Sequence, residues 1–185
     1  GLRWQATSLG EGFRAESGFL ARPRVTSVSL DQRVTFFGGE GSRLATVSSD
    51  VVLNGVWRTR DLADGGGPLE RKIHWNNNAV FRGGWRLGGS VLIERFDFDP
   101  ELYQDYGLLG EDGTILPFTA TPYLHNLDWV LSLDTPQFSG FSASFQRVWG
   151  RDENFFEWSS ADIDYIDATL DYRPTEQLRL EGRYQ

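Results

Sequence analysis

The sequence predicts an all-β protein, an antiparallel up-and-down meander of about eight long strands. Residues that favour strands recur along the chain, and aromatic residues make up 14% of it. Apolar and polar residues alternate over long stretches, so that each strand has one apolar and one polar face. No long stretch shows the 3.6-residue period of an amphipathic helix.

Turn-forming residues separate the alternating segments and give the expected boundaries. Residues 1–24 are predicted to be an entry segment that could add a further strand, and residues 25–185 a partial β-barrel. The predicted strands cover residues 25–37, 43–60, 71–81, 85–97, 123–133, 141–150, 161–172 and 178–185.

The connections between the predicted strands alternate in length. Outer-membrane barrels show this asymmetry, with tight periplasmic turns and long external loops. The predicted strands are also longer than the ~5–6 residues usual in soluble sheets. The short connections are residues 38–42, 82–84, 134–140 and 173–177, and the long ones are residues 61–70, 98–122 and 151–160.

The segment AVFRGGWRLGGSV, residues 79–91, tests the register of one hairpin. A three-residue turn at 82–84 would place Phe81 opposite Trp85 on an apolar face and Asn76 opposite Ser90 on a polar face. The turn would end in a glycine, which adopts the required left-handed conformation at no steric cost. A two-residue turn would mix the faces, so we predict the three-residue turn.

Two further hairpins are predicted by the same matching of faces. In the second, Leu133 should lie opposite Phe141, and Asp128 opposite Gln146. In the third, Tyr172 should lie opposite Leu178. The polar face of the third hairpin should pair Asp171 with Arg179 and Asp167 with Arg183.

Alternation alone would also fit a half-buried soluble sheet, so a soluble sandwich or barrel stays open as an alternative. The strand lengths, the small and cross-paired polar residues and the aromatics beside short turns favour part of a transmembrane outer-membrane barrel. The candidate lumen-lining residues are Asn76, Asn78, Ser90, Asp128, Gln146, Asp167, Asp171, Arg179 and Arg183. The candidate interfacial aromatics are Phe81, Trp85 and Tyr172.

Composition narrows the classes of function. The 26 acidic and 18 basic residues give a formal net charge of −8, which disfavours nucleic acid as a partner. The absence of cysteine excludes disulfides, thiol nucleophiles and Cys-based zinc sites. No apolar run approaches the ~20 residues of a membrane helix. This excludes helical membrane spans but not a membrane barrel, in which strands contact the lipid bilayer.

Few residues are candidates for a chemical role, and no catalytic, cofactor-binding or metal-binding residue is predicted. Acidic residues at 97–112 could bind Ca²⁺ or serve glycoside hydrolysis, but a solvated loop explains them more simply. His74 and His125 lie apart in mid-strand, and a structural role is expected for each. Phe155, Phe156 and Trp158 are candidate loop contacts for a carbohydrate ligand, with interfacial anchoring as the alternative.

Two segments carry a family resemblance. FRAESGFLARPR (13–24) contains Gly18, Phe19 and Arg22, and ERFDFDPEL leads through a loop to PFTATPYLHNLDWVLSLDTPQFSGFSASFQ. Over most of residues 11–185 the chain resembles an uncharacterised β-barrel domain, a domain of unknown function. In Gram-negative bacterial proteins that domain follows a carbohydrate-binding-module-family-9-like domain.

The resemblance implies an outer-membrane location, further barrel strands outside this chain and a carbohydrate-related surface system. It implies no catalytic residues. The expected function is a non-enzymatic outer-membrane barrel that acts as anchor or channel. The alternatives are a carbohydrate-binding β-domain that uses loop aromatics and, less favoured, a glycoside hydrolase.

Overall fold

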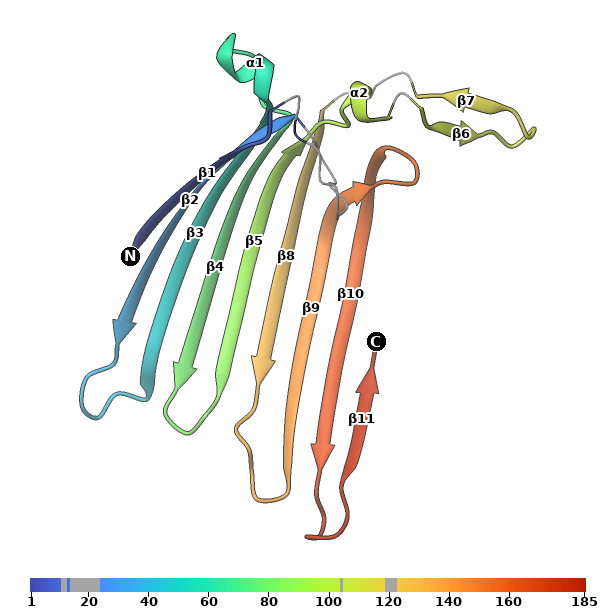
Figure 1. Ribbon diagram of the computed structural model, residues 1–185. Coiled ribbons are helices and arrows are strands. Elements are labelled where there is room, and N and C mark those ends of the chain that lie inside the picture. The colour runs from blue at the N-terminus through green and yellow to red at the C-terminus, as the bar shows by residue number, and fades with distance from the viewer. Residues whose placement is uncertain (11–12, 14–23, 104, 119–122) are drawn as a thin grey trace.

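A nine-stranded antiparallel sheet dominates the computed structural model, which describes residues 1–10, 13, 24–103, 105–118 and 123–185. Consecutive strands of the sheet are neighbours, in the order β1-β2-β3-β4-β5-β8-β9-β10-β11 (Figure 1). The strands are β1 (Leu2–Ser8), β2 (Val25–Phe37), β3 (Leu44–Arg58), β4 (Glu70–Phe81), β5 (Arg86–Phe96), β8 (Leu124–Asp134), β9 (Phe141–Asn154), β10 (Ser159–Tyr172) and β11 (Leu180–Tyr184).

The predicted all-β meander is confirmed, and each predicted strand has its counterpart in the sheet. Strand β1 adds the further strand that the entry segment left open. Two connections hold short elements that were not predicted, because their residues lack a clear alternation. These are α1 (Thr59–Ala63), α2 (Pro100–Tyr103) and a separate two-stranded hairpin of β6 (Gly107–Leu109) and β7 (Ile115–Pro117).

The two ends of the sheet differ in their connections (Figure 1). The short-turn end carries the turns of β2–β3, β4–β5, β8–β9 and β10–β11, and the long-connection end carries α1, α2 and the β6–β7 hairpin. The predicted long connection at 151–160 is wrong, because backbone pairing of β9 with β10 continues to Asn154 and Ser159. Only residues 155–158 remain as a turn, so the alternation of connection lengths is not strict.

The predicted register of the β4–β5 hairpin is confirmed. Asn76 lies opposite Ser90, and the Phe81 amide donates to the Trp85 carbonyl oxygen at 2.9 Å. Gly83 and Gly84 have φ values of 102° and 94°, in the left-handed region that favours glycine. The turn is therefore the three-residue turn at 82–84.

The predicted registers of the other two hairpins are wrong by even numbers of residues. Leu133 lies opposite Phe145 instead of Phe141, because β9 runs past the end of β8 and pairs there with β10 alone. Tyr172 lies opposite Leu180 instead of Leu178. Because side chains alternate with a period of two, neither shift moves a residue to the other face.

The registers place the short-turn ends of three hairpin ladders in one row. The last pairs of β2–β3, β4–β5 and β8–β9 lie directly opposite one another, and the row continues to Thr169 on β10. Strand β10 continues beyond Thr169 to Tyr172 before its own turn, so the β10–β11 hairpin extends past the others. The residues of the row are Thr46, Val80, Arg86, Asp134, Ser144 and Thr169.

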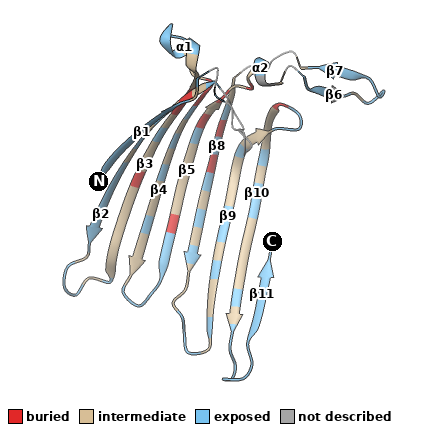
Figure 2. Cartoon of the chain, viewed as in Figure 1, coloured by how far each residue is buried: buried red, intermediate tan, exposed pale blue. Residues whose placement is uncertain are grey.

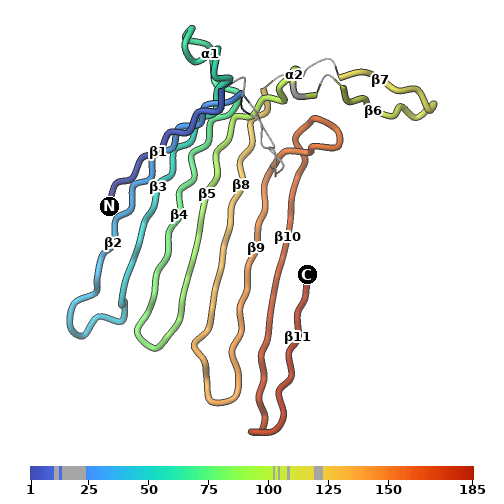
Figure 3. The backbone as a smooth tube through the Cα atoms, in the orientation of Figure 1, coloured from blue at the N-terminus to red at the C-terminus, as the bar shows by residue number. Residues whose placement is uncertain are grey.

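The sheet is a single open layer. The described residues of the edge strands β1 and β11 pair on one side only (Figure 3). Few residues are buried (Figure 2), and the accessible surface is 12977 Å². A compact monomer of 21.0 kDa would expose about 9,000 Å². The polypeptide therefore leaves uncovered a large surface that a globular domain would bury.

A small aromatic cluster forms the core at the long-connection end. Phe96, Phe98 and Trp158 are buried there, and Tyr103 and Phe118 pack against them. The ring centroids of Phe118 and Trp158 are 4.6 Å apart. The cluster fastens α2 and the β9–β10 turn to the end of β5. None of the described helices is long and apolar enough to cross a membrane.

Gly150 permits the close approach of β9 to β8. Its φ is 136°, and an added Cβ would lie 2.2 Å from the Leu127 carbonyl oxygen. We expect Gly150→Ala to lower the free energy of unfolding by roughly 1–3 kcal/mol, because the backbone conformation is strained for other residues. Urea unfolding followed by tryptophan fluorescence measures this loss.

Gly182→Ala is the matched control, because a Cβ there meets no atom within 4 Å. Its stability should equal that of the unmodified chain or exceed it slightly. Equal losses for the two variants would contradict the role assigned to Gly150.

Candidate functional site: the polar concave face

The polar residues of alternate positions share one face of the sheet. One row crosses four neighbouring strands in direct register, from Asn54 through Lys72 and Glu94 to Asn126. Glu94 and Asn126 are 2% and 3% exposed, although the described residues form no second layer over the sheet. Side chains of neighbouring strands, such as Lys72 beside Glu94, contribute to this burial.

A direct contact establishes the direction in which the sheet curves. Ligand oxygens of Glu94 on β5 and of Asp152 and Glu153 on β9 all lie within 4.8 Å of one another, although β8 separates the two strands. The backbones of β5 and β9 are two steps of about 4.8 Å apart, and curvature toward this face shortens the distance between their side chains. The polar face is thus concave and the apolar face convex.

Lys72 is the cation at the centre of this acidic region. Its Nζ atom lies 2.5 Å from a Glu94 carboxylate oxygen and 3.1 Å from Glu70. The Glu94 side chain is fully buried, with 0% exposure, so its charge needs a partner inside the protein. Lys72 supplies that partner.

Glu94, Asp152 and Glu153 are, among the described residues, the group whose carboxylates could hold a metal ion. Carboxylate oxygens are ligands that Ca²⁺ and Mg²⁺ accept. Asp152 and Glu153 fall in the predicted connection at 151–160, where no metal site is predicted. The group became visible only through the extension of β9 and the curvature of the sheet.

Other polar residues extend the concave face on both sides. Asp128 is buried, and the Ser160 hydroxyl donates to the Asn126 side-chain oxygen at 2.7 Å. Asp50, which the sequence analysis did not single out, is buried opposite Asn76 and pairs with Arg33 at 3.0 Å. By register the structure places all the candidate lumen-lining residues on this face: Asn76, Asn78, Ser90, Asp128, Gln146, Asp167, Asp171, Arg179 and Arg183.

Two ion pairs cross the β10–β11 edge on the concave face. Arg179 lies 2.5 Å from Asp171, and Arg183 lies 2.5 Å from Asp167. Each pair is diagonal, because the strands are displaced by two residues from the predicted register. The predicted partners meet all the same, since long arginine side chains span the diagonal.

The three candidate ligand-binding rings of the β9–β10 turn have different surroundings. Trp158 is 8% exposed in the aromatic cluster, so it presents no free ring face. Phe155 packs edge-on against Phe96 and Phe98 at 5.8 and 5.5 Å. Phe156 is 91% exposed and is the ring of this set that a sugar in solvent could stack on.

The candidate interfacial aromatics lie on the convex face beside short turns. Trp85 and Tyr172 are exposed, and Phe81 is half-buried opposite Trp85. The Phe138 ring contacts Trp85 edge-on at 6.2 Å and stacks on Phe141 at 4.6 Å. Aromatic rings therefore gather at the short-turn end of the convex face.

Acidic residues at 97–112 divide into paired and solvent-exposed groups. Arg58 pairs with Asp99 and Asp61, and Arg60 pairs with Glu101, which ties α1 to α2. Burial, together with the nearby Asp99 carboxylate, raises the pKa of Asp97 above its usual range. Arginine partners give several of these acids a structural role.

Comparisons of the chain with family models, with curated proteins and with solved structures gave no match. The resemblance to the uncharacterised β-barrel domain stays a prediction, and its residues Gly18, Phe19 and Arg22 lie outside the described part of the chain. A functional proposal therefore has to be argued from the two faces of the sheet.

Proposed function

We propose that this chain is part of the wall of an outer-membrane β-barrel of a Gram-negative bacterium, with its convex face against lipid. The observation that carries the proposal is a set of large exposed apolar side chains on the convex face of all nine strands. Representative members, one per strand, are Leu2, Leu30, Leu53, Ile73, Ile93, Leu131, Phe141, Leu170 and Tyr184.

Water is a poor solvent for such a face. The largest apolar patch of a typical soluble monomer covers about 300–600 Å², whereas here the apolar side chains continue across the whole sheet. In a lipid bilayer the same surface is solvated by hydrocarbon. Strands of 11 residues, such as β5 and β8, match the ~9–11 residues that cross a bilayer.

Two polar pairings on the convex face are made within the protein. The Trp75 indole N–H donates to the Ser49 hydroxyl at 2.9 Å. Arg147 forms a two-pronged pair with Asp164 at 3.0 and 2.8 Å. Hydrocarbon offers no hydrogen bonds, so a lipid-facing wall requires such internal partners.

Two ion pairs neutralise the charges that β9 and β10 place on the convex face. Arg147, in the middle of β9, pairs with Asp164 on β10. Arg151 pairs with Asp162 nearer the long-connection end of the same two strands. Each of these four charges therefore has a partner within the protein.

The concave face, with its buried charges, suits a polar barrel interior, so we propose a non-enzymatic anchor or channel. Lipid tolerates no open sheet edge. We therefore propose that strands outside these 185 residues pair with β1 and β11. The link to a surface carbohydrate system rests on the family resemblance, and exposed Phe156 is the residue that a sugar-binding role would use.

Quenching of tryptophan fluorescence by brominated lipid tests the proposal, with the chain folded as part of the complete barrel. Six of the seven tryptophans, all except Trp158, occupy convex-face positions. Folding into phosphatidylcholine vesicles whose acyl chains carry bromine should strongly reduce the emission. A chain that stays monomeric in buffer and shows unchanged emission with these vesicles would contradict the proposal.

A further inference from the structure

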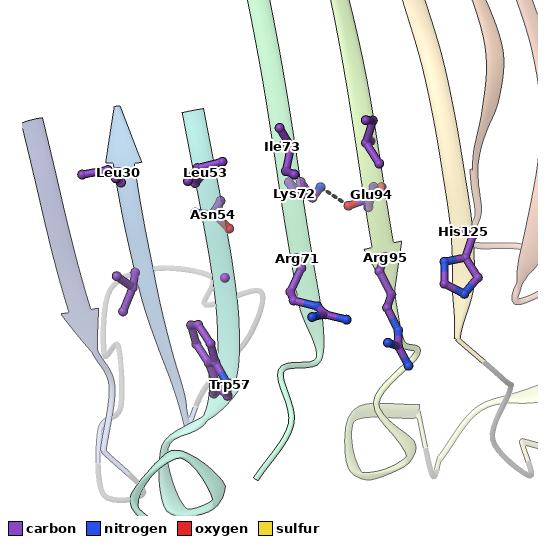
Figure 4. A pocket seen from close by; sticks show the side chains of 13 residues that line it. Leu30, Leu53, Asn54, Trp57, Arg71, Lys72, Ile73, Glu94, Arg95 and His125 are labelled. Atoms are coloured by element: carbon purple, nitrogen blue, oxygen red, sulfur yellow. Dashed lines mark ion pairs between the residues drawn. The ribbon is translucent and has the colours of Figure 1, made fainter. Parts of the chain in front are cut away.

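The convex face changes from apolar to cationic toward the long-connection end. Arg71 on β4 lies directly opposite Arg95 on β5, which lies directly opposite His125 on β8. Figure 4 shows the three side chains in a row on adjacent strands. On each strand the basic residue lies two positions from the apolar row of Ile73 and Ile93, on the same face and nearer the long-connection end. The lipid-facing band thus ends in a basic row.

An open groove of about 530 Å³ joins the two rows. Leu53, Ile73 and Ile93 line its apolar part, and the basic row lines the end near the long connections (Figure 4). The Trp57 ring folds back over Gly55, where a Cβ would lie 2.3 Å from it. We call this feature the cationic groove; it is amphipathic along its length.

The basic row keeps its positive charge. Among the described residues, neither Arg71 nor Arg95 has an ion pair, and the Nε atom of Arg95 is buried without a hydrogen-bond partner. The Arg95 guanidinium lies 3.9 Å from the centre of the Tyr123 ring, which positions it without neutralising it. Arg147 and Arg151 on the same face are both paired.

We propose that the cationic groove binds one anionic lipid, with its phosphate on Arg71 and Arg95 and an acyl chain along Ile73 and Ile93. Guanidinium groups bind phosphate through paired hydrogen bonds, and the apolar part of the groove gives hydrocarbon a place that a free anion would leave empty. In the proposed barrel the long connections face outward, so the ligand is a phosphorylated glycolipid of the outer leaflet. The inference rests on the proposed function.

Native mass spectrometry of the chain in nonionic detergent tests the site, with lipid A as the probe and phosphatidylcholine as the neutral comparison. The double variant Arg71→Gln/Arg95→Gln should bind lipid A roughly 30-fold more weakly, from about 1 kcal/mol per basic residue. Arg71→Lys/Arg95→Lys keeps the charge but loses the paired hydrogen bonds and should be intermediate. Both variants should show unchanged brominated-lipid quenching, which establishes that they fold.

Arg147→Gln/Arg151→Gln is the matched control, because it removes the same charge from the same face and should bind lipid A like the unmodified chain. Equal losses in the control and the test variant would overturn the inference. So would displacement of lipid A by millimolar inorganic phosphate, because the groove would then bind a free anion. If quenching shows insertion but lipid A binding does not change when Arg71 and Arg95 are substituted, the inference fails and the barrel proposal stands. If quenching shows no insertion, both fail.

Discussion

Leu131→Arg should destabilise the chain in a bilayer by about 2–4 kcal/mol, the cost of placing a charge near the membrane midplane on a barrel exterior. Leu131 lies on β8 in the convex face and is 42% exposed. Its register neighbours are Gly89 on β5, which has no side chain, and Arg147 on β9, which carries the same charge, so neither can neutralise the new arginine. Urea unfolding from phosphatidylcholine vesicles measures the loss.

The concave face supplies the control for this experiment. Asn76→Arg introduces the same charge opposite the buried Asp50, where it gains an acidic neighbour, and should change stability little. In a soluble protein Leu131→Arg would not be the more destabilising of the two variants, because replacing an exposed leucine by arginine changes stability by only about 0.5 kcal/mol. A Leu131→Arg variant as stable as the unmodified chain in vesicles would refute the lipid-facing assignment.

Lys72→Met should cost about 3–5 kcal/mol, the loss expected when one partner of a buried ion pair is removed. The fully buried Glu94 carboxylate would lose the ammonium group at 2.5 Å, and Glu70 would lose it at 3.1 Å. The Asp152 carboxylate, whose oxygen lies within 4.8 Å of Glu94, would remain as an acidic neighbour. Equilibrium unfolding in detergent or vesicles measures the effect.

Two further variants test whether this loss of stability comes from the buried charge of Glu94. Adding Glu94→Gln to Lys72→Met should restore part of the stability, since glutamine carries no charge. Arg179→Met removes an arginine whose side chain is 54% exposed from its pair with Asp171, and it should cost much less than Lys72→Met. If Lys72→Met and Arg179→Met cost the same, the concave acidic region does not depend on Lys72.

Sequence alternation predicted the strands and their faces but gave wrong registers for two hairpins. A slip of one residue exchanges the faces, which is why the turn at 82–84 could be predicted. Slips of four residues at Leu133 and two at Tyr172 keep every side chain on its face, so the pattern cannot detect them. The observed β8–β9 register includes a turn hydrogen bond from the Thr135 amide to the Ala143 carbonyl oxygen at 2.9 Å, which the pattern of faces does not predict.

The acidic group of the concave face was harder to predict than the face itself. Glu94 and Asp152 approach each other across an intervening strand, and this contact depends on curvature that no local pattern records. Trp158 was predicted to be a loop ring, yet it is buried with a φ of 49°, which is strained for a bulky residue. Aromatic packing with Phe118 and Tyr103 accompanies that strain.

The central claim is that the convex face meets lipid hydrocarbon. Its most direct test compares two single-tryptophan variants, one that keeps Trp75 at mid-face and one that keeps Trp158 in the aromatic cluster. Folded into vesicles with brominated acyl chains, the Trp75 variant should be strongly quenched and the Trp158 variant weakly quenched. Equal quenching of both, or none for Trp75 in a folded chain, would contradict the assignment of the convex face to lipid.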